Sequence, residues 1–349
     1  MRSSYKKEDV ILLLKDITGL VKPQPAEERE KLIQSGKHYS EMLPAEYVPT
    51  EEYMQIYHNS LKQYAGTVAS AVACLAERII ETRGKDIVFV SLARAGIPAG
   101  ILLKHYLKLK YQLDIPHYSI SIIRGRGIDS NAMDYLLERY KPGQLLFVDG
   151  WTGKGAIYNE LEKNVKNYKG VFPDIAVIAD PANITNLCGT HEDILIPSSC
   201  LNCTVSGLIS RTFLRGDIIG RNDFHGAVYY KELESQDLSY GFIEAVEKEF
   251  TTGHCIKERE VPGKGIDEVK EIAASFGIND INLVKPGIGE ATRVLLRRIP
   301  WRVLISMEYK DEPMLCHLAR LAEEKNVKVL HYPLKHYKCC GIIKKLADT

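Results

Sequence analysis

Four short runs of apolar, largely β-branched residues alternate with helical patterns between residues 86 and 179. The runs are Asp86–Leu92, His117–Ile123, Gln144–Val148 and Asp174–Ala179, and the helical patterns lie at about 100–112, 130–140 and 155–167. Continuous apolar strands that alternate with helices are typical of a parallel sheet covered on both faces. The expected fold class is therefore α/β, and ligands should bind beyond the carboxyl ends of the strands.

A second, smaller α/β unit is expected at the end of the chain. Helical patterns occupy 266–276, 289–298 and 311–325, and strand patterns occupy 281–284, 302–307 and 327–331. This alternation predicts a small α/β/α sandwich. The predicted organisation is a domain at 1–250, a linker at 251–265 and a domain at 266–349. Within the first domain, residues 1–60 should form an extension of short helices and 61–82 a single helix.

Composition excludes several classes of protein. The 349 residues suffice for about two domains. The net charge of +1 excludes a polybasic coat that binds nucleic acid by charge alone. No apolar run approaches the ~20 residues of a membrane span, and no signal peptide is apparent at the start. We therefore expect a cytoplasmic protein without membrane contact, whose eight cysteines are reduced. The oligomeric state is open, a homo-oligomer included.

Three turns after the predicted strands carry chemistry suited to anions. The first is a small-residue turn that opens a helix and contains Ser91, Ala93, Arg94, Ala95 and Gly96. The second places Arg124 and Arg126 between glycines, as in a mobile lid over a charged ligand. The third follows a buried strand and contains Asp149, Gly150, Thr152, Gly153, Lys154 and Gly155. It is not a nucleotide P-loop, because that motif requires glycine at Val148 and serine or threonine at Gly155.

This order of turns resembles the type I phosphoribosyltransferases. The resemblance implies that Asp149 holds the ribose of phosphoribosyl pyrophosphate (PRPP). It also implies that Thr152–Gly155 bind the 5-phosphate and that Ala93–Gly96 bind pyrophosphate with Mg²⁺. Arg94, Arg124 and Arg126 would stabilise the charge that separates as pyrophosphate leaves. The family has two adjacent acids where this chain has Asp149 alone.

The longer combination of HYSEMLPAEY, SLARAGIPAG, VDGWTGKGA and PSSCLNCTVSGLISRT is similar to a bacterial subgroup of tellurium-resistance and stress operons. Some of its members are named cysteine proteases of the StiP type. The leading hypothesis is a PRPP-dependent phosphoribosyltransferase that uses Mg²⁺ and a base-like acceptor. One alternative is a catalytically degenerate sensor of PRPP or a nucleotide that acts through RNA. A more distant alternative is a cysteine peptidase.

The segment Ile196–Gly207 contains the pair Cys200-x-x-Cys203. A zinc site needs about four ligands, and no second C-x-x-C is present, so no metal ligand is assigned. A catalytic thiol with His191 or His225 as its partner is a further reading. The favoured interpretation is a loop that lines the acceptor pocket or packs on the sheet.

The C-terminal unit carries a Pro/Gly turn before a basic helix. Residues 285–349 contain 13 basic and 7 acidic side chains, which favours an RNA partner. The order G-I-G-E-A-T-R, strand, acidic-Pro segment, helix and strand resembles the kink-turn-binding family that includes the last domain of Pelota. The resemblance implies an RNA-binding surface, in which Gly289 replaces an asparagine that reads purine edges. The residues assigned to it are Lys285, Gly287, Gly289, Glu290, Thr292, Arg293 and Arg297.

Overall fold

The structure is a computed structural model that describes residues 1–46, 49–250 and 261–345. Its larger part is built on a six-stranded sheet in the order β1-β4-β3-β7-β8-β9, in which all neighbouring strands are parallel. The strands are β1 (Ile11–Leu12), β3 (Val88–Leu92), β4 (His117–Ile120), β7 (Leu145–Trp151), β8 (Ile175–Ala179) and β9 (Cys188–Thr190). The four predicted strands are all present, and β1 and β9 extend the sheet at its two edges.

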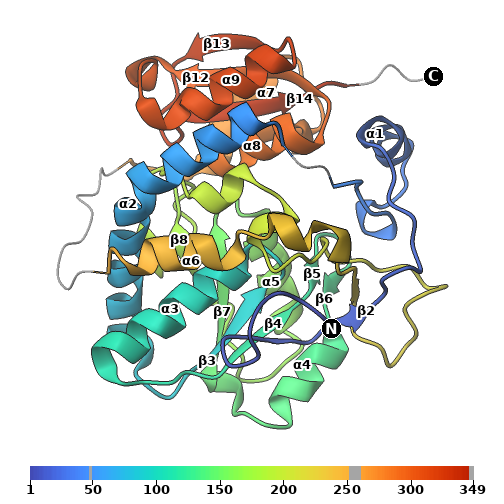
Figure 1. Cartoon of the computed structure of the whole chain (residues 1–349), viewed down its shortest axis with the longest axis vertical. Helices are drawn as coiled ribbons and strands as arrows, with labels where there is room; N and C mark the ends of the chain where they lie inside the picture. The colour runs from blue at the N-terminus through green and yellow to red at the C-terminus, as the bar shows by residue number, and fades with distance from the viewer. Residues whose placement is uncertain (47–48, 251–260, 346–349) are drawn as a thin grey trace.

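Helices cover both faces of this sheet, as predicted (Figure 1). Phe89 and Leu146 pack against one helical layer, whereas their neighbours Val88 and Leu145 pack against the other. The first layer contains α2 (Glu51–Arg83), α3 (Gly96–Tyr111) and α6 (Ser239–Glu247), and the second contains α4 (Ser130–Leu137) and α5 (Ala156–Val165). Because both faces are covered, every residue of β3 is buried, which explains its unbroken apolar run.

The prediction of an extension of short helices in residues 1–60 is confirmed in part, because the short helices α1 (Ala26–Gln34) and η1 (Tyr39–Glu41) lie beside two short strands. The extension contains the short strands β1 and β2 (Lys15–Asp16) and a single α-helix, α1 (Ala26–Gln34), before α2 begins at Glu51. Strand β2 pairs with β10 (Gly226–Ala227). The predicted lid is the turn of a small hairpin between β5 (Ile122–Ile123) and β6 (Gly127–Ile128). Among the described residues no helix has the length and apolar character needed to cross a membrane.

The C-terminal domain is a four-stranded sheet in the order β11-β14-β12-β13, with helices on both faces. Its elements are α7 (Gly265–Ser275), β11 (Val284–Pro286), α8 (Ile288–Arg297), β12 (Pro300–Ser306), α9 (Cys316–Glu324), β13 (Lys328–Tyr332) and β14 (Cys339–Ile343). Val303 and Ile305 pack under α8 and α9, whereas Leu304 packs under α7. The α/β/α sandwich is therefore confirmed. Most of the predicted linker, residues 251–260, lies outside the described residues.

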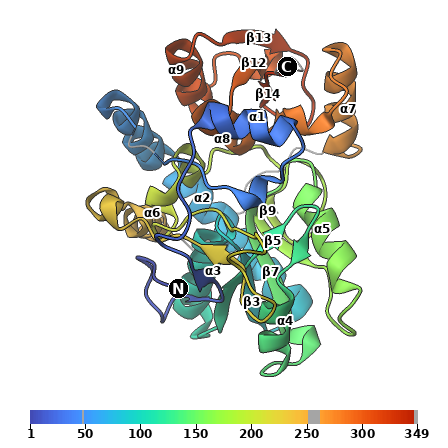
Figure 2. The same ribbon diagram turned by 90° about the vertical axis from the view of Figure 1, so that its right-hand side faces the viewer.

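Helix α8 lies on the side of the C-terminal domain that faces the larger domain (Figures 1 and 2). Asp193, in the segment after β9, joins the two by accepting hydrogen bonds from the backbone N–H groups of Ile288 (3.0 Å) and Lys338 (2.9 Å). Burial raises the pKa of Asp193 to about 6 despite these bonds. The carboxylate therefore caps the first turn of α8, and the beginning of that helix is directed at the strand ends of the large sheet.

Candidate functional site

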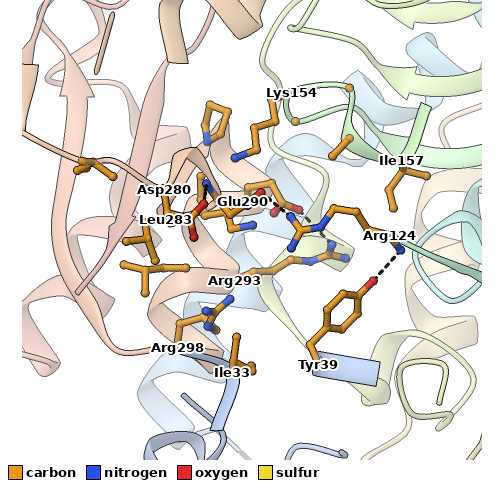
Figure 3. A pocket seen from close by; sticks show the side chains of 18 of the residues that line it. Ile33, Tyr39, Arg124, Lys154, Ile157, Asp280, Leu283, Glu290, Arg293 and Arg298 are labelled. Atoms are coloured by element: carbon orange, nitrogen blue, oxygen red, sulfur yellow. Dashed lines mark hydrogen bonds and ion pairs between the residues drawn. The ribbon is translucent and has the colours of Figure 1, made fainter. Parts of the chain in front are cut away.

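The sheet order changes direction at β3, which lies between β4 and β7. At such a switch point the loops after neighbouring strands diverge and leave a crevice. A cavity of about 850 Å³ occupies this position, between the end of β7 and the C-terminal domain. Figure 3 shows Arg124, Lys154, Glu290 and Arg293 converging on it from the two domains. We call it the interdomain cavity.

The turn after β7 supplies one wall of the interdomain cavity. Lys154 Nζ donates hydrogen bonds to the carbonyl oxygens of Ile281 and Val284, the latter at 3.0 Å. Burial, together with nearby Lys285 and Arg124, lowers the pKa of Lys154 to about 7. Burial likewise raises the pKa of Asp149 to about 7, although its Oδ1 accepts a hydrogen bond from Gly150 N–H. Both side chains therefore change charge near neutral pH.

Helix α8 and strand β11 supply the opposite wall. The guanidinium of Arg293 lies 4.4 Å from the centre of the Trp151 ring and 3.3 Å from Glu290. Gly289 packs so closely on Trp151 that a Cβ at this position would lie 2.5 Å from the ring. The glycine that replaces the asparagine of the Pelota-like pattern is thus a requirement of domain packing. It lies against the other domain, where it cannot read a base edge.

The interdomain cavity brings together part of each predicted site. Its lining includes Ala95, Arg124, Asp149, Thr152, Gly153, Lys154 and Gly155 from the first domain, and Lys285, Glu290 and Arg293 from the second. Sequence reasoning placed these residues in two separate sites. The structure makes them neighbours, because the predicted RNA-binding turn docks onto the predicted phosphate loop.

Other predicted site residues lie elsewhere and are held by internal contacts. Arg94 is buried, pairs with Glu46 at 3.1 Å and donates to the carbonyl oxygen of Ile209. Arg126 is exposed and pairs with Glu41. Thr292 is buried and bonds to His317, and Arg297 bonds to Asn202. These four side chains do not line the interdomain cavity.

The predicted small residues outside the cavity lining have packing roles. Ser91 is buried and bonds to His117 and to the carbonyl oxygen of Gly96. A Cβ on Gly96 would lie 2.3 Å from the carbonyl oxygen of Val148. Gly287 lies beside Asp193, and Ala93 and Gly150 also stay outside the lining. The absence of a side chain at Gly96 therefore allows the first turn of α3 to pack against β7.

A cluster that the sequence analysis missed lies beside this cavity. Cys188 Sγ is 3.4 Å from His191 Nε2, and His191 Nδ1 is 3.0 Å from the carbonyl oxygen and 3.7 Å from Oδ2 of Asp180. The carbonyl can only accept, so Nδ1 carries the hydrogen and Nε2 faces the thiol as an acceptor. We call these three residues the thiol cluster.

Local structure holds the thiol cluster in place. Asp180 directly follows β8, and its carboxylate accepts hydrogen bonds from the N–H groups of Ile184 (2.6 Å) and Thr185 (2.8 Å) and from the Thr152 hydroxyl. The Arg78 guanidinium, from α2, donates to the Cys188 carbonyl at 2.7 Å and lies 3.6 Å from its sulfur. The sulfur is fully buried, whereas the His191 side chain is 26% exposed.

Two signals in the sequence point to the thiol cluster. Asp180 directly follows the predicted strand Asp174–Ala179, and Cys188-Gly-Thr-His191 has a spacing that lets a thiol meet an imidazole across a tight turn. A thiolate, an imidazole and a carboxylate, whose donor atoms lie within 4.8 Å of one another, also form a donor set that suits Zn²⁺.

The C-x-x-C pair does not form a comparable site. Cys200 and Cys203 are buried, and burial raises the pKa of each thiol to about 12. His225 bonds instead to Ser121 at 2.9 Å. His191, the other suggested partner, bonds to Cys188. These cysteines are therefore poor nucleophiles. Cys200 packs in a core shared with the C-terminal domain, whereas Cys203 packs with Ile17, Leu43 and Phe213 of the larger domain.

The comparisons with known proteins identify the family. Residues 3–247 match the model described as tellurite-like stress resistance cysteine protease StiP. The chain belongs to the StiP family. A StiP-family protein from Acinetobacter baylyi (strain ATCC 33305 / BD413 / ADP1), described as "Cysteine protease StiP", is 34% identical, and the alignment covers 98% of this chain and 94% of the relative. Residues 263–345 match the PELOTA RNA binding domain. No solved structure matches the chain.

Membership of the StiP family corrects the leading hypothesis. The prediction of a PRPP-dependent phosphoribosyltransferase is wrong, because the family and the relative are described as cysteine proteases. In the structure, Asp149 accepts a hydrogen bond from the Gly150 N–H, and Tyr337 of the C-terminal domain donates to the carbonyl oxygen of Gly153. The expectation of bound Mg²⁺, which the resemblance linked to PRPP, stays a prediction. The association with tellurium resistance and stress agrees with the family description.

Proposed function

We propose that this StiP-family chain is a cysteine peptidase whose nucleophile is Cys188. The observation that carries the proposal is the 3.4 Å contact between Cys188 Sγ and His191 Nε2. It is supported by the description of the family and of the Acinetobacter relative. Among the free cysteines of the described residues, Cys188 is the one whose sulfur lies within hydrogen-bond distance of a histidine ring.

The thiol cluster supplies the groups that peptide hydrolysis needs. His191 takes the thiol proton at Nε2, and the Cys188 thiolate attacks the scissile carbonyl carbon. The protonated imidazole then gives its proton to the leaving amine, which leaves an acyl-enzyme thioester. A water molecule, deprotonated by the same imidazole, hydrolyses the thioester and regenerates the thiol. Asp180 orients the ring and stabilises the imidazolium through its carbonyl and carboxylate oxygens.

The buried sulfur implies that the site must open before a polypeptide reaches it. Cys188 lies on β9, the last strand at one edge of the sheet, and α2 covers that strand. Gly189 is so close to Ala71 of α2 that a Cβ would lie 2.2 Å from the Ala71 carbonyl oxygen. Arg78, on the same helix, lies against the sulfur. We expect movement of this part of α2 to control access to the nucleophile.

A second candidate function is RNA binding by the C-terminal domain. It is supported by the match of residues 263–345 to the PELOTA RNA binding domain and by the net positive charge of residues 285–349. The two functions are compatible, because they involve different residues of the segment 180–193. The thiol cluster uses Cys188 and His191, whereas the C-terminal domain contacts Asp193.

The peptidase proposal is tested with purified full-length protein and fluorescently labelled casein as a general substrate. We expect Cys188→Ala to abolish hydrolysis and Cys203→Ala, the matched control, to retain it. Alkylation by iodoacetamide, mapped by mass spectrometry, should label Cys188 before Cys200 or Cys203. Activity should survive EDTA and fall on addition of Zn²⁺, which would occupy the same three groups.

Two outcomes would overturn the assignment. Casein hydrolysis that persists in Cys188→Ala would exclude this nucleophile. Hydrolysis that is lost on chelation and restored by Zn²⁺ would show that the thiol cluster is a metal centre.

A further inference from the structure

The interdomain cavity holds more positive than negative charge. Eight basic side chains and four acidic side chains line it. Two of the acids are already paired, Glu30 with Arg298 at 2.6 Å and Glu290 with Arg293 at 3.3 Å. A third, Asp149, is largely protonated below pH 7 because burial raises its pKa. The cavity therefore presents a surplus of cations that the protein itself does not neutralise.

Three of these cations come from the N-terminal domain and lack an ion pair within the part of the chain that the structure describes. Arg124 donates to the neutral side chain of Asn282 at 2.7 Å, and Lys154 donates to backbone carbonyls. Arg211 stacks on Tyr39, with its guanidinium 4.5 Å from the ring centre. Each is half-buried, so solvent only partly screens the repulsion between them.

The lowered pKa values of these basic groups agree with a cluster of cations that repel one another. Burial and nearby Arg29 lower the pKa of Arg211 to about 9. Burial, Lys285 and Arg124 lower the pKa of Lys154 to about 7. Arg29 is 3% exposed, and its buried Nε has no hydrogen-bond partner among the residues that the structure describes. An anion in the cavity would relieve this repulsion and favour the charged form of Lys154.

Aromatic side chains also line the cavity, and the guanidinium groups of Arg211 and Arg293 lie over two of these rings. Tyr39, Trp151, Phe276 and Trp301 all line it. Its volume of about 850 Å³ falls within the usual range for small-ligand sites, and it accommodates one or two nucleotides. Cationic side chains for phosphates and aromatic faces for bases are the combination that proteins use to bind single-stranded nucleic acid. Because the domain on one side of the cavity matches an RNA-binding domain, RNA is the source of nucleotide that fits best.

We propose that the interdomain cavity binds unpaired nucleotides of an RNA strand, with phosphate contacts from Arg124, Lys154 and Arg211 of the N-terminal domain. The inference rests on the proposed RNA binding and adds that residues of both domains form the RNA site. RNA would thus bridge the StiP-family domain and the Pelota-like domain. It would also adjoin the thiol cluster, because Thr152 in the cavity wall bonds to Asp180.

The test measures binding of a labelled 12-nucleotide single-stranded RNA to the full-length protein by fluorescence anisotropy, at several salt concentrations. Arg211→Gln and Lys154→Met should each weaken RNA binding about 5- to 30-fold. Each should also reduce the slope of log affinity against log salt concentration by about one. Arg139→Gln is the matched control, because Arg139 lies over Tyr135 and pairs with Glu138 away from the cavity. It should bind RNA as the unaltered protein does. RNA that contains 4-thiouridine should crosslink to Tyr39 or Trp151.

The possible outcomes distinguish the proposed cavity site from RNA binding by the protein in general. RNA affinity that is unchanged in both cavity variants, with crosslinks confined to exposed faces of the C-terminal domain, would overturn the cavity site but leave RNA binding in place. Failure of the unaltered protein to bind any RNA would overturn the proposed RNA function itself. A mononucleotide that binds as tightly as the 12-nucleotide RNA and displaces it would identify a small-molecule site and overturn the assignment to RNA.

Discussion

The thiol cluster and the interdomain cavity are neighbours with opposite construction. The cluster comes from one segment of 12 residues between Asp180 and His191, is held by short-range hydrogen bonds, and buries its sulfur completely. The cavity is assembled from both domains, is open to a ligand, and carries cations that form no ion pair with the described residues. Thr152 contacts both, because it lines the cavity and donates to Asp180. The comparison shows that a reactive group can be protected by local structure while recognition depends on how domains dock.

The largest expected effect tests the thiol cluster. His191→Gln should lower kcat for casein hydrolysis by about 10²- to 10⁴-fold, because the general base is lost while the thiol remains. The rate of Cys188 alkylation, measured by mass spectrometry, should fall in parallel. His225→Gln, at a histidine that bonds to Ser121, is the control and should keep its activity. Casein hydrolysis by His191→Gln at the rate of the unaltered protein would show that the thiol cluster is not the catalytic site.

A second prediction tests how much the cavity depends on domain docking. Gly289→Asn restores the residue of the Pelota-like pattern but places a Cβ about 2.5 Å from Trp151. We expect overpacking to weaken docking by about 1–3 kcal/mol, and hence to lower Tm and accelerate tryptic cleavage between the domains. Gly216→Ala is the control, since a Cβ there meets nothing within 4 Å. A protein with unchanged Tm and cleavage would show that this contact does not hold the domains together.

A third prediction uses pH to separate the two regions. Lys154, whose pKa is lowered to about 7, gains a proton when a phosphate binds, and Asp149 becomes negative above about pH 7. Both effects favour anion binding at lower pH. RNA affinity should therefore fall about 5- to 10-fold between pH 6 and pH 8. Lys154→Met should show a flatter profile, whereas Cys188→Ala should follow the unaltered protein. An identical slope in Lys154→Met would exclude this lysine as the titrating group.

The smallest expected effect concerns stability. Because the pKa of Asp149 is raised from 3.8 to about 7 in the folded state, its contribution to stability is complete at low pH and is lost as pH rises from about 4 to 7. Asp149→Asn resembles the protonated form and keeps an oxygen for Gly150 N–H. Its Tm should match the unaltered protein near pH 4 and exceed it by about 2–4 °C at pH 8. A Tm that stays equal at pH 8 would contradict the proposed cost of charging this carboxyl.

The sequence by itself determined the elements and their class. The unbroken apolar runs Asp86–Leu92 and Asp174–Ala179 become β3 and β8, because a strand covered on both faces must be apolar at every position. The α/β/α form of the C-terminal domain follows from periodicity in the same way. The edge strand β9 has three residues, and its Cys-Gly-Thr sequence carries too weak a pattern to be recognised.

Only the tertiary structure decided which side chains meet. Cys188 and His191 are close in sequence, but their contact depends on a turn that Asp180 holds from the end of another strand. Lys154 contacts the Ile281–Val284 turn, although the two lie more than 120 positions apart in the sequence. The packing of α8 on Trp151 brings them together. Local patterns report the burial of single elements, whereas a site between domains depends on long-range contacts that no local pattern encodes.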